Sequence, residues 1–331
     1  MAQTVLVTGG TGFIAGWCIV QLLERGYAVR TTVRDAAKEQ RVRAAVRGNT
    51  DRLSVVVADL NDDRGWDAAV AGCDYVLHVA SPLGGGAVKD RHALVAPARD
   101  GTLRVLRAAA NAGVKRVVMT SAAATARPPL TSDRVSDESI WADPEDPQFD
   151  AYRVSKILAE RAAWDFMQSE GKASMLTTIL PGAVFGPLRD AENLGSVQII
   201  HGMLRGRPGA LPRLGFWIVD VRDLADLHIR AMTAAAAAGQ RFIAAGEFMW
   251  MEGMAKTLRA QLGEQGAKVP TRRLPDFVVR LLLPFMANLR TLAPLLGRRF
   301  PINTDKSRKV LAFAPRPAAA TLVDCARSLL D

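Results

Sequence analysis

Cysteine and histidine are scarce in this sequence. Three cysteines and four histidines occur among 331 residues, and Cys18, Cys73 and Cys325 lie far apart without a CxxC pair. This pattern argues against a disulfide framework and a structural zinc site, and it is typical of a reducing compartment. No serine–histidine–acid ordering emerges, so a hydrolase has little support. We expect no metal site and a cytoplasmic location, since a strand-like run from residue 5 leaves no room for a signal peptide.

A long uninterrupted hydrophobic run is also absent. The most apolar late stretch, residues 277–296, is broken by Arg280, Pro284, Arg290 and Pro294. Charges and prolines of this kind argue against a membrane-spanning helix. We expect an amphipathic core or lid segment here, with contact to a membrane surface as a minor alternative.

Aromatic residues make up only 6% of the chain, whereas Lys and Arg number 43 against 33 Asp and Glu, a formal net charge of +10. The basic residues are scattered and are not interleaved with aromatic ones, so no nucleic-acid partner is expected. The charge serves either solubility or the attraction of anions such as cofactor phosphates and acidic substrates.

Strand-like and helix-like segments alternate along most of the chain. This order predicts an α/β fold, a Rossmann-type doubly wound parallel sheet with a smaller C-terminal substrate-capping lobe. We expect residues 1–187 to form a dinucleotide-binding domain, to which residues 216–245 return, and residues 188–331 to form mainly the substrate-binding lobe. The alanine run at residues 231–238 predicts a surface helix that ends at Gly239. The expected strands of the sheet lie at residues 5–7, 27–33, 53–60, 74–80, 115–120 and 175–180.

The glycine-rich segment at residues 8–15 follows the first strand directly. It reads Thr-Gly-Gly-Thr-Gly-Phe-Ile-Ala, and helical periodicity begins at Phe13. Glycines let the backbone approach a pyrophosphate closely, and the helix N-terminus then offers free N–H groups and a positive dipole end. A strand, a glycine turn and a helix in this order predict a dinucleotide phosphate site.

Arg34 follows the second strand, where a dinucleotide fold meets the adenosine ribose. A guanidinium there pairs with the 2′-phosphate of NADP, and Lys38 and Arg41 lie on the following helix. Asp35 has two interpretations, as a partner of the NAD ribose or as the N-cap of that helix. NADP(H) is favoured over NAD(H).

Tyr152 and Lys156 are four residues apart and therefore share one face of a predicted helix. A free tyrosine titrates near pH 10, and a lysine ammonium one turn away is expected to lower that pKa and to hydrogen-bond a nicotinamide ribose. The alternative is a chance pair on an amphipathic helix. Because a dinucleotide motif stands upstream, we favour a catalytic pair.

The loop after the fourth strand is harder to interpret. Ser81 and Pro82 precede Gly84-Gly85-Gly86. These glycines either provide plain flexibility or let the backbone pass a nicotinamide ribose. His78, in the strand before the loop, is expected to be a buried core residue.

In combination, these motifs resemble the extended short-chain dehydrogenase/reductase family. The resemblance is to the branch with dihydroflavonol reductases, cinnamoyl-CoA reductases and bacterial aldehyde or ketone reductases, and it covers nearly the whole chain. Besides the glycine segment and Tyr152/Lys156, it rests on residues 32–35, 58–60, 78–82, 181–187 and 219–224.

The resemblance implies a role for each matching residue. Tyr152 would protonate a carbonyl, Lys156 would tune it, and Arg34 would receive the 2′-phosphate. The expected partners are a small aldehyde or ketone substrate and, as in the family, a second copy in a homodimer. The implied cofactor-binding residues are Thr8, Gly9, Thr11, Gly12, Phe13, Ile14, Arg34, Lys38, Asp59, Leu60, Val79, Ala80, Ser81, Thr120, Tyr152, Lys156, Pro181 and Val184.

Two positions depart from the family pattern. The fifth strand ends Thr120-Ser121-Ala122, so alanine stands where a serine usually orients the substrate carbonyl. Ser121, which we retain as a candidate catalytic residue, or Thr125 would have to supply that hydroxyl, unless Tyr152 acts nearly alone. Losing one such donor costs about a hundredfold in rate, so a weak or unusually selective enzyme is expected. Arg127 and Pro128 stand near the position where the plant flavonoid reductases carry a polar substrate-binding asparagine, which disfavours a flavonoid substrate. Arg127 either meets an anionic substrate or is simply solvated.

Three functions therefore remain open. The favoured one is an NADPH-dependent reductase that transfers hydride to an aldehyde or ketone carbonyl. The alternatives are a nucleotide-sugar epimerase or dehydratase that uses NAD, which Arg34 argues against, and a non-catalytic dinucleotide-binding scaffold, which Ala122 allows.

Overall fold

The computed structural model describes residues 2–48, 50–81, 90, 92–189, 194–282 and 293–330. Pro82 and the glycines at positions 84–86 lie outside these described residues, as does much of the apolar stretch expected to form a core or lid segment. In the described part, no helix is long and apolar enough to cross a membrane.

Seven parallel strands form the main sheet, in the order β3-β2-β1-β4-β5-β6-β9. The order reverses beside β1, between β1 and β4, which is the switch point where ligands bind in sheets of this kind. The predicted doubly wound parallel sheet is therefore confirmed. The strands are β1 (Thr4–Val7), β2 (Ala28–Val33), β3 (Leu53–Val57), β4 (Tyr75–His78), β5 (Arg116–Thr120), β6 (Leu176–Pro181) and β9 (Gln240–Ala244).

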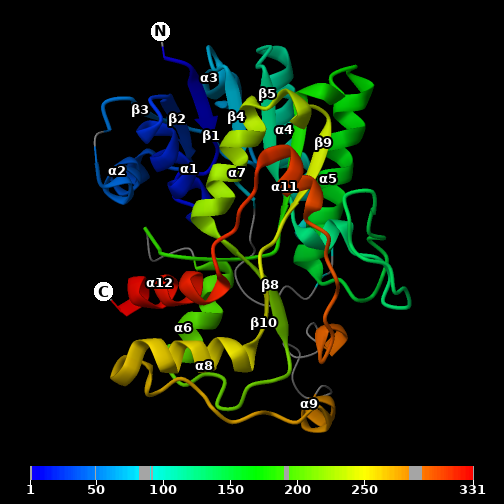
Figure 1. Ribbon diagram of the computed structural model, residues 1–331. Helices are drawn as coiled ribbons and strands as arrows, with labels where there is room; N and C mark the ends of the chain where they lie inside the picture. Colours follow the sequence, from blue (N-terminus) through cyan, green and yellow to red (C-terminus); the bar gives the residue numbers. More distant parts are fainter. Residues whose placement is uncertain are drawn as a thin grey trace.

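Helices cover both faces of this sheet (Figure 1). The side chains of β1 alternate between two cores, because Val5 and Val7 pack on one side and Leu6 on the other. The first core includes α1 (Phe13–Glu24), α2 (Glu39–Val46), α7 (Val221–Thr233) and α11 (Asp305–Leu311). The second includes α3 (Trp66–Val70), α4 (Val95–Asn111) and α5 (Ala151–Ser169).

A smaller lobe lies beyond the carboxyl edge of the sheet and has a hydrophobic core of its own (Figure 1). Its three-stranded sheet has the order β10-β8-β7, with β8 parallel to β7 and antiparallel to β10. Of residues 216–245, α7 and β9 join the main layers, whereas β8 belongs to the lobe. The lobe elements are β7 (Ala183–Phe185), α6 (Gln198–Leu204), β8 (Gly215–Asp220), β10 (Phe248–Trp250), α8 (Met251–Leu262), α9 (Asp276–Leu282) and α12 (Ala318–Leu330).

The alanine run does not form the helix expected over residues 231–238. Helix α7 begins earlier and ends at Thr233, Ala234 has extended backbone with φ −69° and ψ 122°, and Ala235–Ala237 is a short 3₁₀ turn. Ala231 and Ala237 are fully buried. The chain must leave the helix to enter β9 beside β6, and this tertiary pairing outweighs the helix propensity of alanine.

A buried ion pair lies beneath the carboxyl edge of the sheet. Arg241 Nε in β9 donates to Glu160 Oε1 in α5 at 2.9 Å, and Arg241 Nη1 donates to the carbonyl oxygens of Glu138 and Ile140. Burial by itself raises the pKa of Glu160, but Arg241 and hydrogen bonds from neighbouring hydroxyls outweigh it and hold that pKa below its usual value. The pair ties α5, β9 and the loop around residues 138–140 together.

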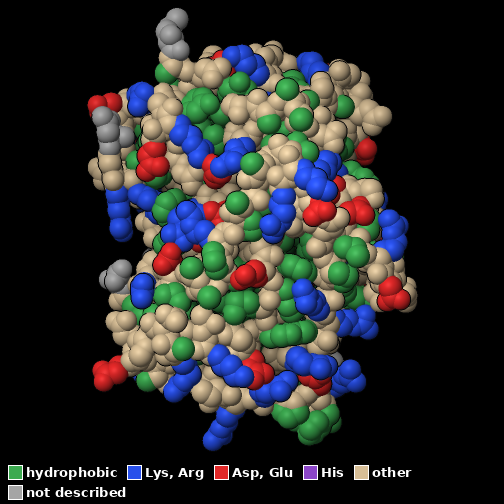
Figure 2. All heavy atoms as spheres, viewed as in Figure 1, with side chains coloured by type: hydrophobic (Ala, Val, Ile, Leu, Met, Phe, Trp, Pro, Cys, Tyr) green, Lys and Arg blue, Asp and Glu red, His purple; other side chains and the backbone are tan. Residues whose placement is uncertain are grey.

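Charged side chains of both signs lie mixed on the visible face of the molecule (Figure 2). On the face seen in Figure 2, Lys and Arg occur over both lobes with Asp and Glu among them. The pattern agrees with the scattered basic residues of the sequence and offers no continuous track for a nucleic-acid backbone on that face.

Candidate dinucleotide and carbonyl site

The turn after β1 requires glycine at two positions. Gly9 has φ +73°, and a Cβ on it would lie 2.9 Å from the Ala80 Cβ. A Cβ on Gly10 would lie 2.5 Å from Thr31 Oγ1. Both contacts are too short for a side chain, so the turn keeps its backbone open to a ligand.

Three N–H groups of this turn are already hydrogen-bonded within the protein. Those of Gly9 and Gly10 donate to Thr32 Oγ1 and O at 2.9 and 2.8 Å, and that of Gly12 donates to the Gly9 carbonyl oxygen. Gly12 is the N-cap of α1 and no side chain caps this helix. The first-turn amides of α1 are therefore the ones available to a phosphate group.

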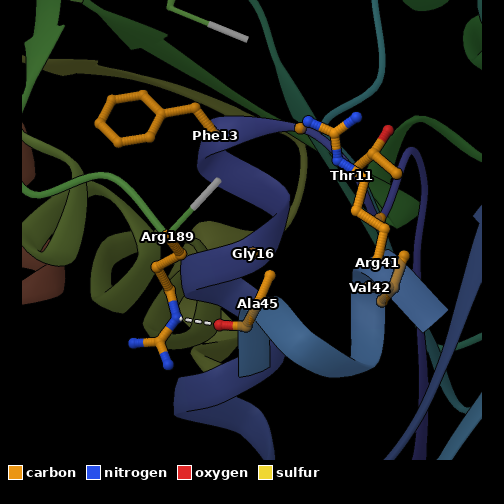
Figure 3. Close-up of a pocket in the computed structure, with 9 residues that line it drawn as sticks. Thr11, Phe13, Gly16, Arg41, Val42, Ala45 and Arg189 are labelled. Atoms are coloured by element: carbon orange, nitrogen blue, oxygen red, sulfur yellow. Dashed lines mark hydrogen bonds between the residues drawn. The ribbon is translucent and has the colours of Figure 1, made fainter. Parts of the chain in front are cut away.

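A small hollow, open to solvent, lies between this turn, α1 and α2. Figure 3 shows Arg189 entering it on one side and Arg41 beside Thr11 on the other. Arg189 Nε donates to the Ala45 carbonyl oxygen at 2.6 Å, and its guanidinium lies 4.8 Å from the Trp17 ring centroid. Sequence analysis missed Arg189, because only the fold brings the segment after β7 to the end of α2.

The Thr8 hydroxyl is buried and fixes the backbone at the end of β4. It accepts hydrogen bonds from the Val79 and Ala80 amides at 3.1 and 3.0 Å, so its own proton is directed to His78 Nδ1, 3.0 Å away. Thr8 thus places the strand end that carries Val79 and Ala80. As expected, His78 is a buried core residue, 2% exposed.

The residues expected around the adenosine lie at the ends of β2 and β3. Arg34 is exposed directly after β2, and Lys38 is partly exposed within the next turn. Asp35 Oδ1 accepts the Ala37 amide at 2.9 Å, so the interpretation of Asp35 as an N-cap is the one seen. Asp59 Oδ1 accepts both the amide and the side chain of Asn61.

Most other predicted cofactor residues are partly exposed where strands end. They lie after β1, β3 and β4, or in β7, on the edge that faces the lobe. Pro181, by contrast, is buried at the end of β6. The partly exposed set is Thr11, Gly12, Phe13, Ile14, Leu60, Val79, Ala80, Ser81 and Val184.

Lys156 joins α5 to the sheet edge. Its Nζ donates to the Thr120 carbonyl oxygen at 3.0 Å, and burial lowers its pKa to about 8 against an opposing effect of Glu160. Tyr152, one turn earlier, is partly exposed, and its hydroxyl has no hydrogen-bond partner among the described residues. A phenol without a partner is available to a ligand at this edge.

The expected lowering of the Tyr152 pKa is not found. Burial raises it, and of the two charged neighbours that act on it, Arg153 lowers it and Asp150 raises it. The Lys156 ammonium is directed at a backbone carbonyl and not at the phenol, which explains the difference. Tyr152 is therefore fully protonated at neutral pH.

Neither hydroxyl near Ala122 is free in this structure. Ser121 Oγ donates to Glu160 Oε2 at 2.6 Å, and Thr125 Oγ1 donates to the Ala122 carbonyl oxygen at 2.9 Å. Both belong to the network around the Glu160–Arg241 pair, whereas Ala122 is partly exposed. The geometry makes Ser121 and Thr125 parts of the support of the site.

Thr120 is held from the opposite face of the sheet. His228 Nδ1 donates to the Leu224 carbonyl oxygen at 2.7 Å, so its Nε2 accepts from Thr120 Oγ1, also at 2.7 Å. Sequence analysis did not find this bond, since the two residues are 108 positions apart in the sequence.

Arg127 is partly exposed. Its Nη1 is buried without a partner, and its guanidinium lies near the rings of Phe300 and Phe149.

Comparison with known proteins shows the family of this chain. The model of the NAD dependent epimerase/dehydratase family matches residues 5–245. A ketoreductase of Aspergillus niger, azaE, is 32% identical over 354 residues, covering 100% of this chain and 98% of its own. A cinnamoyl-CoA reductase of Medicago truncatula, CAD2, is 39% identical over 252 residues, covering 72% of this chain and 75% of its own.

A solved structure is similar over the whole chain. Yeast methylglyoxal/isovaleraldehyde reductase Gre2, complexed with NADPH, superposes with a TM-score of 0.81 at 26% identity. The superposition covers 99% of this chain and 98% of that one.

The two buried histidines predict how stability depends on pH. Burial lowers the pKa of His78 to about 3 and of His228 to about 4, from 6.5. Below pH 6.5 the two histidines bind protons in the unfolded chain but stay neutral in the folded chain. The free energy of unfolding therefore falls as the pH falls towards the lowered pKa values. Each histidine should lower the free energy of unfolding by about 2 kcal/mol between pH 6.5 and 5.0. Urea unfolding at pH 7.5, 6.5 and 5.0 measures this loss.

His228→Gln should remove about half of the loss, and His92→Gln, at an exposed position, should leave it unchanged. Equal stability of the wild type at pH 6.5 and 5.0 would contradict this account.

Proposed function

Because the chain belongs to the NAD dependent epimerase/dehydratase family and its extended short-chain dehydrogenase/reductase motifs are confirmed, we propose that it is an NADPH-dependent reductase of aldehydes or ketones. It is an NAD(P)-dependent oxidoreductase of this family. The observation that carries the finer proposal is the unpartnered Tyr152 hydroxyl, one helical turn from Lys156, at the sheet edge that also bears the glycine turn.

The described residues fit a dinucleotide. The glycine turn leaves no room for a Cβ, the first turn of α1 is uncapped, and Arg34 and Lys38 stand where an adenosine 2′-phosphate would lie. Asp59 and Leu60 would flank the adenine, and Val79, Ala80, Pro181 and Val184 would line the nicotinamide half. NADPH, when bound, supplies the hydride.

Tyr152 would donate its proton to the carbonyl oxygen of the substrate. A raised pKa keeps the phenol protonated at neutral pH, as a proton donor requires. Lys156 would hold the cofactor ribose with the donors that its bond to Thr120 leaves over, since an ammonium has three. Ala122 offers no hydrogen-bond donor to the substrate carbonyl, so Tyr152 would supply most of the polarisation of that carbonyl.

The alternatives have less support. An epimerase that uses NAD would be served by a carboxylate near the ribose, whereas Asp35 caps a turn and Arg34 is exposed beside it. A scaffold protein would have no need of an unpartnered phenol one turn from a buried lysine.

We expect Tyr152→Phe to lower kcat/KM at least about a thousandfold in NADPH oxidation with a panel of aldehydes and ketones, because the proton donor is removed. The Kd for NADPH should change less than about threefold. Tyr27→Phe, at a partly exposed position between α1 and β2, is the matched control and should retain activity. Tyr152→Phe activity equal to wild type would exclude the proposed proton donor; no turnover by the wild type would favour the scaffold.

Arg34 predicts the choice of cofactor. NADPH should raise Tm more than NADH, and Arg34→Gln should weaken NADPH binding about tenfold or more by loss of a charged hydrogen bond to the 2′-phosphate. NADH binding should be nearly unchanged, because NADH lacks this phosphate. Arg327→Gln, at an exposed position on α12, is the control. Titration calorimetry that finds equal losses for both cofactors would contradict the role of Arg34.

Ala122→Ser should increase kcat/KM for aldehydes by roughly 10- to 100-fold, because it adds the hydrogen-bond donor that neither Ser121 nor Thr125 has free. Ala123→Ser, one position along and also partly exposed, should have no such effect. Steady-state kinetics of the two variants tests this prediction. An unchanged kcat/KM for Ala122→Ser would mean that the reaction needs no hydrogen-bond donor at position 122.

A further inference from the structure

Helix α9 presents two apolar side chains to solvent. Phe277 and Leu281 are 72% and 70% exposed, whereas no other large apolar side chain of the described residues exceeds the 51% of Val57. The two residues are four positions apart and therefore share one face of the helix. In Figure 1, α9 lies at the end of the lobe that points away from the main sheet, an end that we call the lobe tip.

The exposure of these two side chains follows from the way α9 is docked. Val279, which lies between them in the sequence, is 3% exposed and belongs to the hydrophobic core of the lobe. Asp276, at the start of the helix, pairs with Arg213 at 2.6 Å. Because these contacts fix the other face of α9 to the lobe, Phe277 and Leu281 are directed outward.

The lobe tip is also basic. Residues 205–213 contain three arginines and no carboxylate, and residues 267–281 contain four Lys and Arg and one carboxylate. The two segments lie side by side, since the Leu211 amide donates to the Arg272 carbonyl oxygen and the Leu274 amide to the Leu211 carbonyl oxygen, both at 2.8 Å. Five of these cations are exposed and have no ion-pair partner among the described residues: Arg205, Arg207, Lys268, Arg272 and Arg280.

Figure 2 shows both features at the lower end of the molecule, an apolar patch at the place of α9 with Lys and Arg side chains beside it. Apolar side chains flanked by cations are the combination that binds an anionic lipid surface. Phe and Leu enter the boundary between headgroups and acyl chains, while Lys and Arg stay at the anionic headgroups. Since no described helix is long and apolar enough to cross a membrane, such a contact would be peripheral.

Other partners fit the lobe tip less well. A second copy of the chain would bring the same cations face to face, and like charges repel each other. A protein partner would need roughly 800 Å² of complementary surface with few charges at its centre. Here two apolar side chains protrude from a seven-residue helix among cations, a shape that suits a fluid surface.

We propose that the lobe tip binds the surface of an anionic membrane, with Phe277 and Leu281 inserted between the lipid headgroups. Because α9 lies at the end of the lobe remote from the main sheet, the dinucleotide and carbonyl site stays open to water in this arrangement. The inference is independent of the proposed reductase activity.

Co-sedimentation of the full chain with lipid vesicles tests the proposal. In about 0.1 M salt the wild type should bind phosphatidylcholine vesicles that contain roughly one third phosphatidylserine at least about tenfold more tightly than pure phosphatidylcholine vesicles. About 0.5 M salt should remove most of this difference by screening. Phe277→Ser/Leu281→Ser should weaken binding to the anionic vesicles about tenfold or more, because the inserted side chains are removed. Arg272→Gln/Arg280→Gln should reduce the preference for phosphatidylserine.

Matched variants elsewhere on the surface separate the lobe tip from general effects. Val135→Ser/Val310→Ser removes two other exposed apolar side chains, and Arg107→Gln/Arg134→Gln removes two other exposed charges. Both should bind vesicles as the wild type does. Since all the substituted side chains are exposed, the Tm of each variant should stay close to that of the wild type.

Three results would overturn the proposal. The first is a wild type that binds neither kind of vesicle, and the second is equal binding by the wild type and Phe277→Ser/Leu281→Ser. The third is a wild-type dimer in light scattering that the same double variant dissociates, without vesicle binding, which would assign the two side chains to a second copy. NADPH oxidation in solution tests the reductase separately, so either assignment can fail while the other stands.

A thiol label reports insertion directly. The three native cysteines are buried, so Phe277→Cys and Val310→Cys each provide an exposed thiol for an environment-sensitive dye. Emission from the dye at position 277 should shift to the blue on phosphatidylserine vesicles, whereas emission from position 310 should not change. Absence of a shift at position 277 would overturn the insertion of α9.

Discussion

The hydrogen bond from Lys156 Nζ to the Thr120 carbonyl oxygen joins the helix that carries Tyr152 to the carboxyl edge of the main sheet. It is buried, so water does not compete for the ammonium, and an unpaired charge at this depth would be strongly unfavourable. The register of α5 on the sheet therefore depends on it. Tyr152 lies one turn earlier on the same face, which brings its hydroxyl to the edge where the glycine turn also opens.

Polar groups beneath this edge hold the bond in place, and nearly all of them are satisfied. On one face, Thr8 organises the end of β4 and directs its proton to a neutral His78. On the same face, which α4 and α5 cover, Glu160 of the Glu160–Arg241 pair accepts from the Ser121 hydroxyl, and on the opposite face, which α7 covers, His228 accepts from Thr120. A fully satisfied buried network is rigid, because each displacement would leave a donor or acceptor without a partner.

The position of Arg127 stands out against this network. It is partly exposed, its guanidinium lies near two aromatic rings, and Arg153, Asp150 and Asp146 act on its charge state. The Tyr152 hydroxyl, by contrast, is without a partner among the described residues and lies at the edge where the glycine turn opens.

Local patterns predicted much of this molecule. The glycine segment predicted a close backbone approach, and the φ of Gly9 and the space at Gly10 indeed admit no side chain. The spacing of Tyr152 and Lys156 predicted a shared helical face. Other features were out of reach, because they depend on contacts between distant segments. The alanine run breaks where β9 must pair with β6, and Ser121 is bound by Glu160. Burial raises the pKa of Tyr152, which the spacing to Lys156 alone suggested would fall.

The sequence by itself determined the doubly wound fold, the phosphate turn and the proton donor candidate, since each follows from residues within one helical turn or one strand of each other. Only the tertiary structure decided which polar side chains are satisfied and which remain open. Whether a polar side chain has a hydrogen-bond partner depends on residues that are tens of positions away in the sequence. Burial makes a donor without a partner unfavourable. On this ground Ser121 belongs to the support of the site, whereas the Tyr152 hydroxyl remains without a partner among the described residues.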